Sequence, residues 1–292
     1  MRPKGFEYFA PNTIDEAIGL LGKYEEEAKI LAGGLSLVPL MKLRLAEPKY
    51  LIDINKIPNL SSVTEGNDGV LRIGALTPYY ILEGSGLIRT KSPIIHEVAS
   101  TLGDPQVRNR GTIGGNICHA DSACEFLPVI LALDVELKAM SSSGERIIKA
   151  SDFFLGMLST ALNRGELLTE IGVKTILPNT GQTYQKLVVR SGDHPIVSVA
   201  AIIKLGKNKI CEYINIRLGS VAPIPVKARE TEKALLGEKI NDELINSAAE
   251  LSTNGIEPIS DTHASSEYRT EMTKVMTRRA LKLAFNRAGG NK

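Results

Sequence analysis

The chain has only three cysteines, Cys118, Cys124 and Cys211, and no tryptophan. Three thiols are too few for a four-thiolate iron–sulfur cluster, and they lack the paired spacing of zinc and redox sites. We therefore expect buried free thiols and no cluster in this chain. The four histidines are widely separated and form no spaced ligand pair, so the sequence predicts no metal site.

Charge of one sign and long apolar runs are also missing. The 292 residues carry 35 basic and 33 acidic side chains, a formal net charge of +2, which provides no basic stripe for nucleic acid. No stretch approaches the length that spans a bilayer, and residues 1–6 lack the apolar core of a signal peptide. We therefore expect a cytoplasmic protein that binds neither nucleic acid nor membrane.

Recognisable catalytic sets are absent too. No serine–histidine–acid or cysteine–histidine arrangement can be assembled from neighbouring residues, and no pair of catalytic carboxylates stands out. The sequence therefore favours a protein whose chemistry is carried by a bound cofactor.

Two glycine pairs, about eighty residues apart, are the most informative feature that is present. Gly33-Gly34 and Gly114-Gly115 each interrupt an apolar run that predicts a strand, and a small polar residue, Ser36 or Asn116, follows. Because glycine reaches positive φ without penalty and has no Cβ, successive N–H groups in such a turn converge into an anion nest. Two nests suit a pyrophosphate, and a plain tight turn is the alternative for each pair.

The residues that flank the two glycine pairs indicate which kinds of nucleotide site are excluded. The apolar residues after Ser36 predict a helix whose positive end would add to the first nest. Neither pair has the Gly-x-Gly-x-x-Gly spacing of a Rossmann site or the Lys-Ser/Thr of a P-loop. A different dinucleotide fold is implied.

The pattern of the chain predicts an α+β fold in three units, 1–57, 58–177 and 178–292. In the first unit a capping box at Thr13 begins a helix that ends near Gly22, and strands are expected at 29–32 and 50–54. In the second, the expected elements are a strand at 70–75, a helix that starts with Thr77 and Pro78, helices at 93–102 and 126–133, and a hairpin of 135–139 with 146–149.

The third unit follows a linker expected at 178–182, where turn-forming residues separate two extended apolar runs. Three antiparallel strands are predicted first, at 184–190, 196–205 and 210–218, and then helices at 228–236, 242–251 and 267–288. The C-terminal unit is therefore expected to combine a three-stranded sheet with helices.

The motifs also resemble a known family. They are, in chain order, 32–37 with 41–44, 105–116, 119–121 leading to 125–128, 184–186, 190–193, 219–223 and 265–269. In their order along the chain and in their residues, these segments resemble the FAD-binding medium subunit of the molybdenum hydroxylases, the family of carbon monoxide dehydrogenase, aldehyde oxidoreductases and xanthine dehydrogenases. The resemblance covers nearly the whole chain, and it implies a two-part FAD-binding domain of the vanillyl-alcohol-oxidase type followed by a C-terminal flavoprotein domain.

The resemblance assigns the FAD diphosphate to two segments. The first glycine segment consists of Ala32, Gly33, Gly34, Leu35, Ser36 and Leu37, and the second consists of Thr112, Ile113, Gly114, Gly115 and Asn116. Backbone amides, the hydroxyls of Ser36 and Thr112 and the Asn116 amide would hold the phosphates. For Asn116, a role as a capping or turn residue is the alternative.

Three further residues belong to the implied FAD site. Glu125 resembles a residue that binds the ribose or the adenine edge, and a helix N-terminal acid is its alternative. Lys186 has the side-chain direction of Tyr184 on one strand, so both are expected to face a cleft, with a solvated lysine as the alternative. His194 stands where relatives often place an aromatic near the isoalloxazine, and it would either bind the flavin or face solvent. Leu35 and Asp104 also depart from the family pattern.

The resemblance finally implies partners. A large chain with a molybdenum cofactor and a small chain with [2Fe-2S] clusters would join this one, as a two-fold dimer of heterotrimers. FAD would pass electrons from the clusters to an external acceptor, with an aldehyde or carbon monoxide as substrate. Two other functions stay open: a self-sufficient FAD oxidoreductase that acts directly on an organic substrate, and a nucleotide-binding module that only stabilises a partner.

Overall fold

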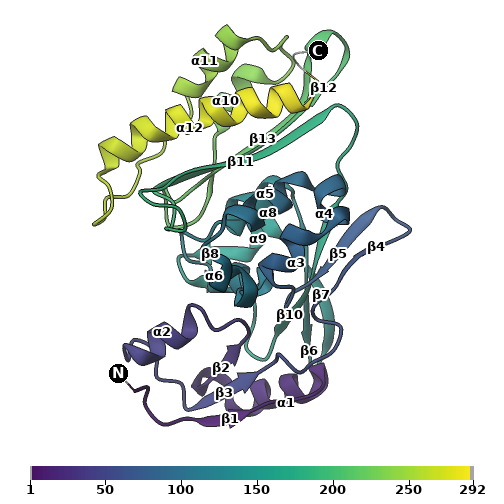
Figure 1. Ribbon diagram of the computed structural model, residues 1–292, viewed down its shortest axis with the longest axis vertical. Helices are drawn as coiled ribbons and strands as arrows, with labels where there is room; N and C mark the ends of the chain where they lie inside the picture. The colour runs from purple at the N-terminus through teal and green to yellow at the C-terminus, as the bar shows by residue number, and fades with distance from the viewer. Residues whose placement is uncertain (1, 290–292) are drawn as a thin grey trace.

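The computed structural model describes residues 2–289. Figure 1 shows an elongated molecule in which three sheets, each with its own helices, follow one another along the long axis. The N-terminus lies at the end formed by the first sheet, and the C-terminus lies at the opposite end.

The first sheet contains three parallel strands in the order β1 (Glu7–Phe9), β3 (Tyr50–Asp53), β2 (Ala28–Leu31). Helix α1 (Ile14–Tyr24) packs against it, and the Thr13 hydroxyl caps this helix by accepting from the Glu16 N–H, as the capping box predicts. A short 3₁₀ turn, η1 (Glu25–Glu27), leads into β2, and helix α2 (Leu37–Lys42) follows β2. Strand β1 was not predicted, because it is short and half exposed.

The middle part is built on a five-stranded sheet in the order β4 (Val63–Glu65), β5 (Val70–Gly74), β10 (Leu167–Lys174), β6 (Glu136–Ser141), β7 (Gly144–Lys149). Its helices are α3 (Tyr79–Gly84), α4 (Gly86–Lys91), α5 (Pro93–Thr101), α6 (Pro105–Arg110), α7 (Ile113–His119), α8 (Phe126–Ala132) and α9 (Ala150–Phe153), and a two-stranded ribbon joins β8 (Phe154–Gly156) to β9 (Ser159–Thr160). The apolar side of α5 is buried as its spacing predicts.

The C-terminal part holds a sheet in the order β11 (Thr180–Leu187), β12 (Val197–Leu205), β13 (Cys211–Gly219), β14 (Val226–Lys227), with η2 (Lys207–Lys209) at one turn. Helices α10 (Arg229–Leu235), α11 (Asp242–Glu250) and the long α12 (Ser266–Arg287) complete it. Helix α12 crosses one face of the sheet (Figure 1), so closely that a Cβ at Gly181 would lie 1.8 Å from the Ala284 carbonyl oxygen.

Several predictions about elements were wrong. The C-terminal sheet has four strands within the described residues instead of three, because β14 adds two residues beside β13. The expected linker at 178–182 runs into β11, where its last residues pair with β12. Helices α6 and α7 replace the strand and turn expected around Gly114, and β10 was not predicted. The division of the chain at 57 and 177 stays a prediction.

Two possible features are not found within residues 2–289. None of the helices there is both long and apolar enough to cross a membrane. No group of three or more histidine, cysteine or acidic side chains in the same residues is arranged to hold a metal ion.

Arg269 is the most deeply buried arginine of the C-terminal part, with 2% of its surface exposed. Its guanidinium donates to the carbonyls of Ile196 and Ser220 and, at 2.6 Å, to the Asp261 carboxylate. One side chain therefore joins α12 to the residue before β12 and the residue after β13, at one end of the sheet.

Replacing Arg269 by leucine should lower the free energy of unfolding by about 3 kcal/mol, because the Asp261 charge and two carbonyls lose their buried partner. Arg164→Leu is the control, since Arg164 and Glu26 form an ion pair that is about 70% exposed on both sides and should matter little. Urea denaturation monitored by circular dichroism measures both, and equal losses in the two variants would contradict this account.

Candidate functional site

The two glycine segments, far apart in the sequence, lie against each other. A Cβ at Gly33 would be 2.3 Å from the carbonyl oxygen of Arg110, and a Cβ at Gly115 would be 3.8 Å from the Cβ of Ala32. The end of strand β2 therefore meets the start of helix α7. The convergence expected for a pyrophosphate site is present in the backbone itself.

The first glycine segment presents unpaired amides. Gly34 has φ +78°, which turns the chain out of β2, and its carbonyl accepts from the Val38 N–H at 2.9 Å to start α2. The backbone N–H groups of residues 33–36 donate no hydrogen bond to any acceptor within residues 2–289. Four successive free donors next to a glycine turn form the anion nest that the sequence predicts. The helix after Ser36 is confirmed, but the Ser36 hydroxyl does not cap it.

The second glycine segment differs from the prediction of a strand followed by a glycine turn. Gly114 and Gly115 lie in the first turn of α7, and neither has a positive φ. The Gly114 N–H donates to the Ala75 carbonyl at 2.8 Å, and the Gly115 N–H donates to the Thr112 hydroxyl at 3.1 Å. The sequence predicted that these two amides would be free to bind phosphate, but both already donate to acceptors within the protein.

Close packing explains why glycine is needed at these two positions. A Cβ at Gly114 would lie 2.6 Å from both the oxygen and the Cβ of Ala75 at the end of β5, and one at Gly115 would lie 2.8 Å from the Thr112 hydroxyl oxygen. Ile113 is completely buried beside them and donates its N–H to Thr77. The pair thus brings α7 against the sheet and next to the first segment.

The side chain of Asn116 is engaged inside the protein. Its Oδ1 accepts from the N–H of Phe126, the first residue of α8, at 3.3 Å, and its amide N–H group donates to the oxygen of the buried Tyr79 hydroxyl. Burial raises the pKa of Tyr79 far above its usual range, so this phenol stays protonated. The oxygen of Asn116 therefore serves α8, which agrees with the alternative of a capping residue.

Glu125 and Lys186, predicted from separate motifs, come together across two parts of the molecule. The Lys186 ammonium lies 2.8 Å from one carboxylate oxygen of Glu125, and the Tyr184 hydroxyl donates to the same carboxylate at 3.1 Å. Glu125 is 3% exposed, and Lys186 also donates to the Thr101 carbonyl at 2.8 Å. Tyr184 and Lys186 therefore point to the same side of β11, as predicted, and the alternative of a solvated lysine is wrong. That they face a cofactor cleft stays a prediction.

Burial raises the pKa of Glu125, while Lys186 and the Tyr184 hydroxyl act in the opposite direction. Glu125 is the N-cap residue of α8, as its alternative role of a helix N-terminal acid predicts, although its side chain makes no capping hydrogen bond. Its carboxylate is already occupied by two donors from β11. Contact with a ribose or adenine edge stays a prediction.

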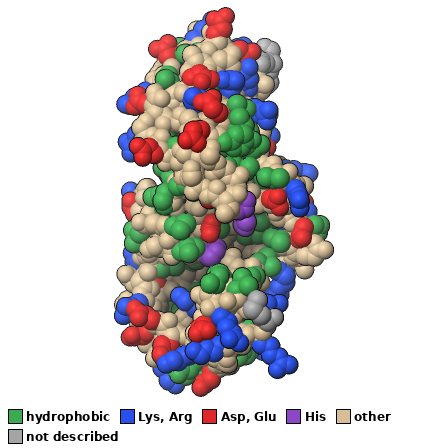
Figure 2. All heavy atoms as spheres, turned by 90° about the vertical axis from the view of Figure 1, so that its left-hand side faces the viewer, with side chains coloured by type: hydrophobic (Ala, Val, Ile, Leu, Met, Phe, Trp, Pro, Cys, Tyr) green, Lys and Arg blue, Asp and Glu red, His purple; other side chains and the backbone are tan. Residues whose placement is uncertain are grey.

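His194 lies exposed on the loop between β11 and β12 and close to the end of α7. Burial lowers the pKa of His119, the last residue of α7, the Asp121 carboxylate acts in the opposite direction, and the nearby imidazole of His194 lowers the pKa further. Figure 2 shows histidine side chains near the middle of one face of the molecule, next to a hollow bordered by apolar surface. His194 is therefore exposed near the C-terminal end of α7, and its contact with the flavin stays a prediction.

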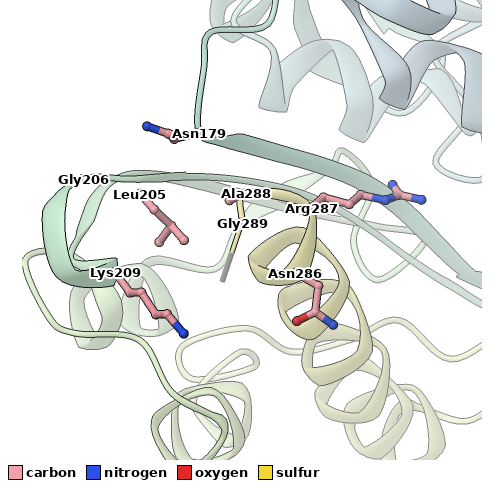
Figure 3. Close-up of a pocket in the computed structure, with 8 residues that line it drawn as sticks. All are labelled: Asn179, Leu205, Gly206, Lys209, Asn286, Arg287, Ala288 and Gly289. Atoms are coloured by element: carbon pink, nitrogen blue, oxygen red, sulfur yellow. The ribbon is translucent and has the colours of Figure 1, made fainter. Parts of the chain in front are cut away.

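A pocket of about 320 Å³ lies elsewhere, at the C-terminal end of α12 (Figure 3). Its walls come from the β12–β13 turn, the start of β11 and the last turn of α12: Asn179, Leu205, Gly206, Lys209, Asn286, Arg287, Ala288 and Gly289. None of the predicted site residues lines it. The converging glycine segments, rather than this pocket, are the candidate site.

Sequence reasoning missed one residue that touches the candidate site. Asn55 follows β3 and donates its side-chain amide to the Ala32 carbonyl at 2.9 Å. The available signal was its place just beyond the carboxyl end of a parallel strand, where ligand sites of open α/β sheets form. Asp104, noted as a departure from the family pattern, caps α6 through the Val107 N–H.

Comparison with known proteins identifies the family of the chain. Residues 4–175 match the family described as the FAD binding domain in molybdopterin dehydrogenase, and residues 182–284 match the CO dehydrogenase flavoprotein C-terminal domain. The glyceraldehyde dehydrogenase medium chain of Sulfolobus acidocaldarius is 41% identical over 282 residues, which is 97% of this chain and 99% of that relative.

Solved structures show the same fold. Carbon monoxide dehydrogenase from Hydrogenophaga pseudoflava contains a chain that superposes with a TM-score of 0.95 at 38% identity, over 98% of this chain and 99% of that one. A chain of quinoline 2-oxidoreductase from Pseudomonas putida 86 superposes with a TM-score of 0.92 at 31% identity, over 99% and 100%. The family predicted from the motifs is therefore confirmed, and the chain belongs to the FAD-binding medium subunits of the molybdenum hydroxylases.

Proposed function

We propose that the two glycine segments hold the diphosphate of one FAD, and that this chain passes electrons from the clusters of a small [2Fe-2S] subunit to an external acceptor. The free amides of residues 33–36, next to the second glycine segment, are the observation that carries the proposal. FAD supplies the electron-accepting chemistry, while the chain binds and orients it.

The two glycine segments would contact the FAD diphosphate in different ways. The first glycine segment offers backbone donors, and Leu35 and Ser36 are exposed beside them. The second brings the N-terminal turn of α7 close, and the Thr112 hydroxyl, which accepts from Gly115, keeps its own proton to donate to a phosphate oxygen. The Asn116 amide would add to the phosphate contacts, and Glu125, Lys186 and His194 would contact the remainder of the cofactor. The fold is proposed to be of the vanillyl-alcohol-oxidase type.

The partners follow from the family. We propose a large subunit with a molybdenum cofactor and a small iron–sulfur subunit, assembled with this chain as a cytoplasmic dimer of heterotrimers, with an aldehyde or carbon monoxide as substrate. The relatives named for glyceraldehyde dehydrogenase and carbon monoxide dehydrogenase support these two substrate classes.

FAD should be bound without a covalent link. Cys118 in α7 is a candidate nucleophile because it lies two residues after Asn116 of the second glycine segment. Burial raises the pKa of the Cys118 thiol to about 12, which keeps the thiol unreactive. Acid precipitation of the loaded protein should release all of the yellow flavin into the supernatant, as absorbance at visible wavelengths measures. Flavin that stays in the pellet would show a covalent bond.

Gly34→Ala should fold but bind FAD at least tenfold more weakly, a loss of about 1.4 kcal/mol. A Cβ at Gly34 would meet Leu31 Cδ1 at 3.0 Å, and its φ of +78° is strained for alanine, so the turn that aligns the free amides must shift. Titration of the ligand-free chain with FAD, followed by flavin fluorescence, measures the dissociation constant.

Gly69→Ala is the matched control. Gly69 has a φ of +72° in the β4–β5 turn, and its Cβ would meet only the Thr175 hydroxyl at 3.9 Å. The same backbone strain is therefore introduced outside the site, and FAD affinity should not change. If both variants bind FAD like the unmodified chain, the first glycine segment does not hold the cofactor.

Purification from the native source should recover molybdenum, iron and FAD in one particle, whose mass by light scattering corresponds to two copies of each chain. Under anaerobic conditions an aldehyde or carbon monoxide should reduce the flavin of this particle but not that of the isolated chain. Reduction of the isolated flavoprotein by an organic donor would instead support a self-sufficient oxidoreductase. A chain that binds nucleotide but stays colourless would support an assembly module.

A further inference from the structure

A hydrogen-bonded group of side chains occupies the carboxyl edge of the first sheet, outside the contacts assigned to FAD above. It consists of Tyr8 on β1, Asp53 at the end of β3, and Asn55 two residues later. The Tyr8 hydroxyl donates to one Asp53 oxygen at 2.6 Å. The other Asp53 oxygen accepts from both the backbone N–H of Asn55, at 2.9 Å, and its side-chain amide, at 2.6 Å. Asn55 is thereby held in one orientation.

The amide of Asn55 reaches the first glycine segment. Its Nδ2 donates to the Ala32 carbonyl at 2.9 Å and lies 3.4 Å from the carbonyl of Leu31, which accepts from the Ile54 N–H. The peptide unit is planar, so the Ala32 carbonyl and the Gly33 N–H point in opposite directions in one rigid group. A side chain that fixes this carbonyl therefore also aims the first free amide of the nest.

The charge on Asp53 is maintained at this edge. Burial disfavours its ionised form, but the hydrogen bonds from Tyr8 and Asn55 and the positive charge of Arg110 together hold the pKa of Asp53 below its usual value. Arg110 is also the residue whose carbonyl touches Gly33. An ionised Asp53 accepts all three hydrogen bonds at neutral pH and so keeps Asn55 in place.

We propose that Asn55, oriented by Asp53 and Tyr8, is a positioning residue that aligns the amides of the first glycine segment with the FAD diphosphate. The proposal rests on the proposed FAD site. Asn55 itself touches the segment from the side of the carbonyls, so it acts through the backbone and not as a cofactor ligand.

The test uses the full chain without flavin and the variant Asn55→Ala, in which an exposed side chain is truncated. FAD is titrated with fluorescence detection, and ADP is titrated as a competitor because it carries the diphosphate without the flavin ring. We expect Asn55→Ala to raise the dissociation constants of both FAD and ADP at least tenfold. Tyr8→Phe should raise them less, since Asp53 keeps both contacts with Asn55.

Thr13→Ala is the matched control in the same part of the molecule. It removes the N-cap of α1, and with it some stability of the first sheet, without touching the glycine segment. Its FAD and ADP affinities should stay within twofold of those of the unmodified chain, even where its melting temperature falls as far as that of Asn55→Ala.

The outcomes separate the two proposals. If the unmodified chain binds neither FAD nor ADP, the proposed FAD site fails, and the role of Asn55 fails with it. If the unmodified chain binds both and Asn55→Ala binds them equally well, only the role of Asn55 is overturned. An equal loss of affinity in Thr13→Ala and Asn55→Ala would also overturn it, because the effect would then follow general stability.

Discussion

The contact between Gly33 and the carbonyl of Arg110 is the constraint on which the candidate site depends. The space for a Cβ at this point is missing, since it would lie 2.3 Å from the oxygen. Without this approach, the parallel sheet at the N-terminal end and helix α7 of the middle part would be held apart by a side chain. One missing methyl group therefore decides whether two distant segments form one surface.

A second set of contacts holds the C-terminal part on the middle part. One of these contacts is the buried ion pair of Lys186 and Glu125. A second, separate contact is made by Arg287 of α12, which lies 3.0 Å from the Glu97 carboxylate and also donates to the Gln182 carbonyl. Because desolvation offsets much of the attraction between buried charges, such pairs contribute direction more than net stability. The backbone N–H of Ser220 adds a bond to the Ser122 carbonyl, between the two parts. These directional contacts fix β11 and the end of β13 on the middle part.

Local patterns in the sequence predicted a large share of this architecture. The cap at Thr13, the apolar face of α5 and the hairpin of β6 with β7 depend on neighbouring residues, and all three are present. The family was also recognised from motifs. Strand β10 was not, because it pairs with β5 and β6, which lie far from it in the chain, and the pattern of its own residues does not show those partners.

The site was predicted less completely than the fold. A glycine pair in a turn and a glycine pair in the first turn of a helix give the same sequence pattern, because both positions require a residue without a Cβ. The difference lies in Ala75, whose carbonyl takes the Gly114 amide and whose Cβ leaves no room for a side chain. That contact joins residues 39 positions apart and has no local signal. Asn55 was missed for a similar reason, since its partner carbonyl lies on another strand.

The arrangement separates two requirements that a flavin subunit has to meet. Backbone amides from the first glycine segment can hold a diphosphate whatever side chains surround them, because they depend only on the course of the chain. The side chains proposed to contact the rest of the cofactor, Lys186 and His194, come instead from β11 and the loop after it, in a different part of the molecule. If FAD binds as proposed, histidine in place of an aromatic residue at position 194 would change the surroundings of the flavin ring without moving the backbone amides of the first glycine segment.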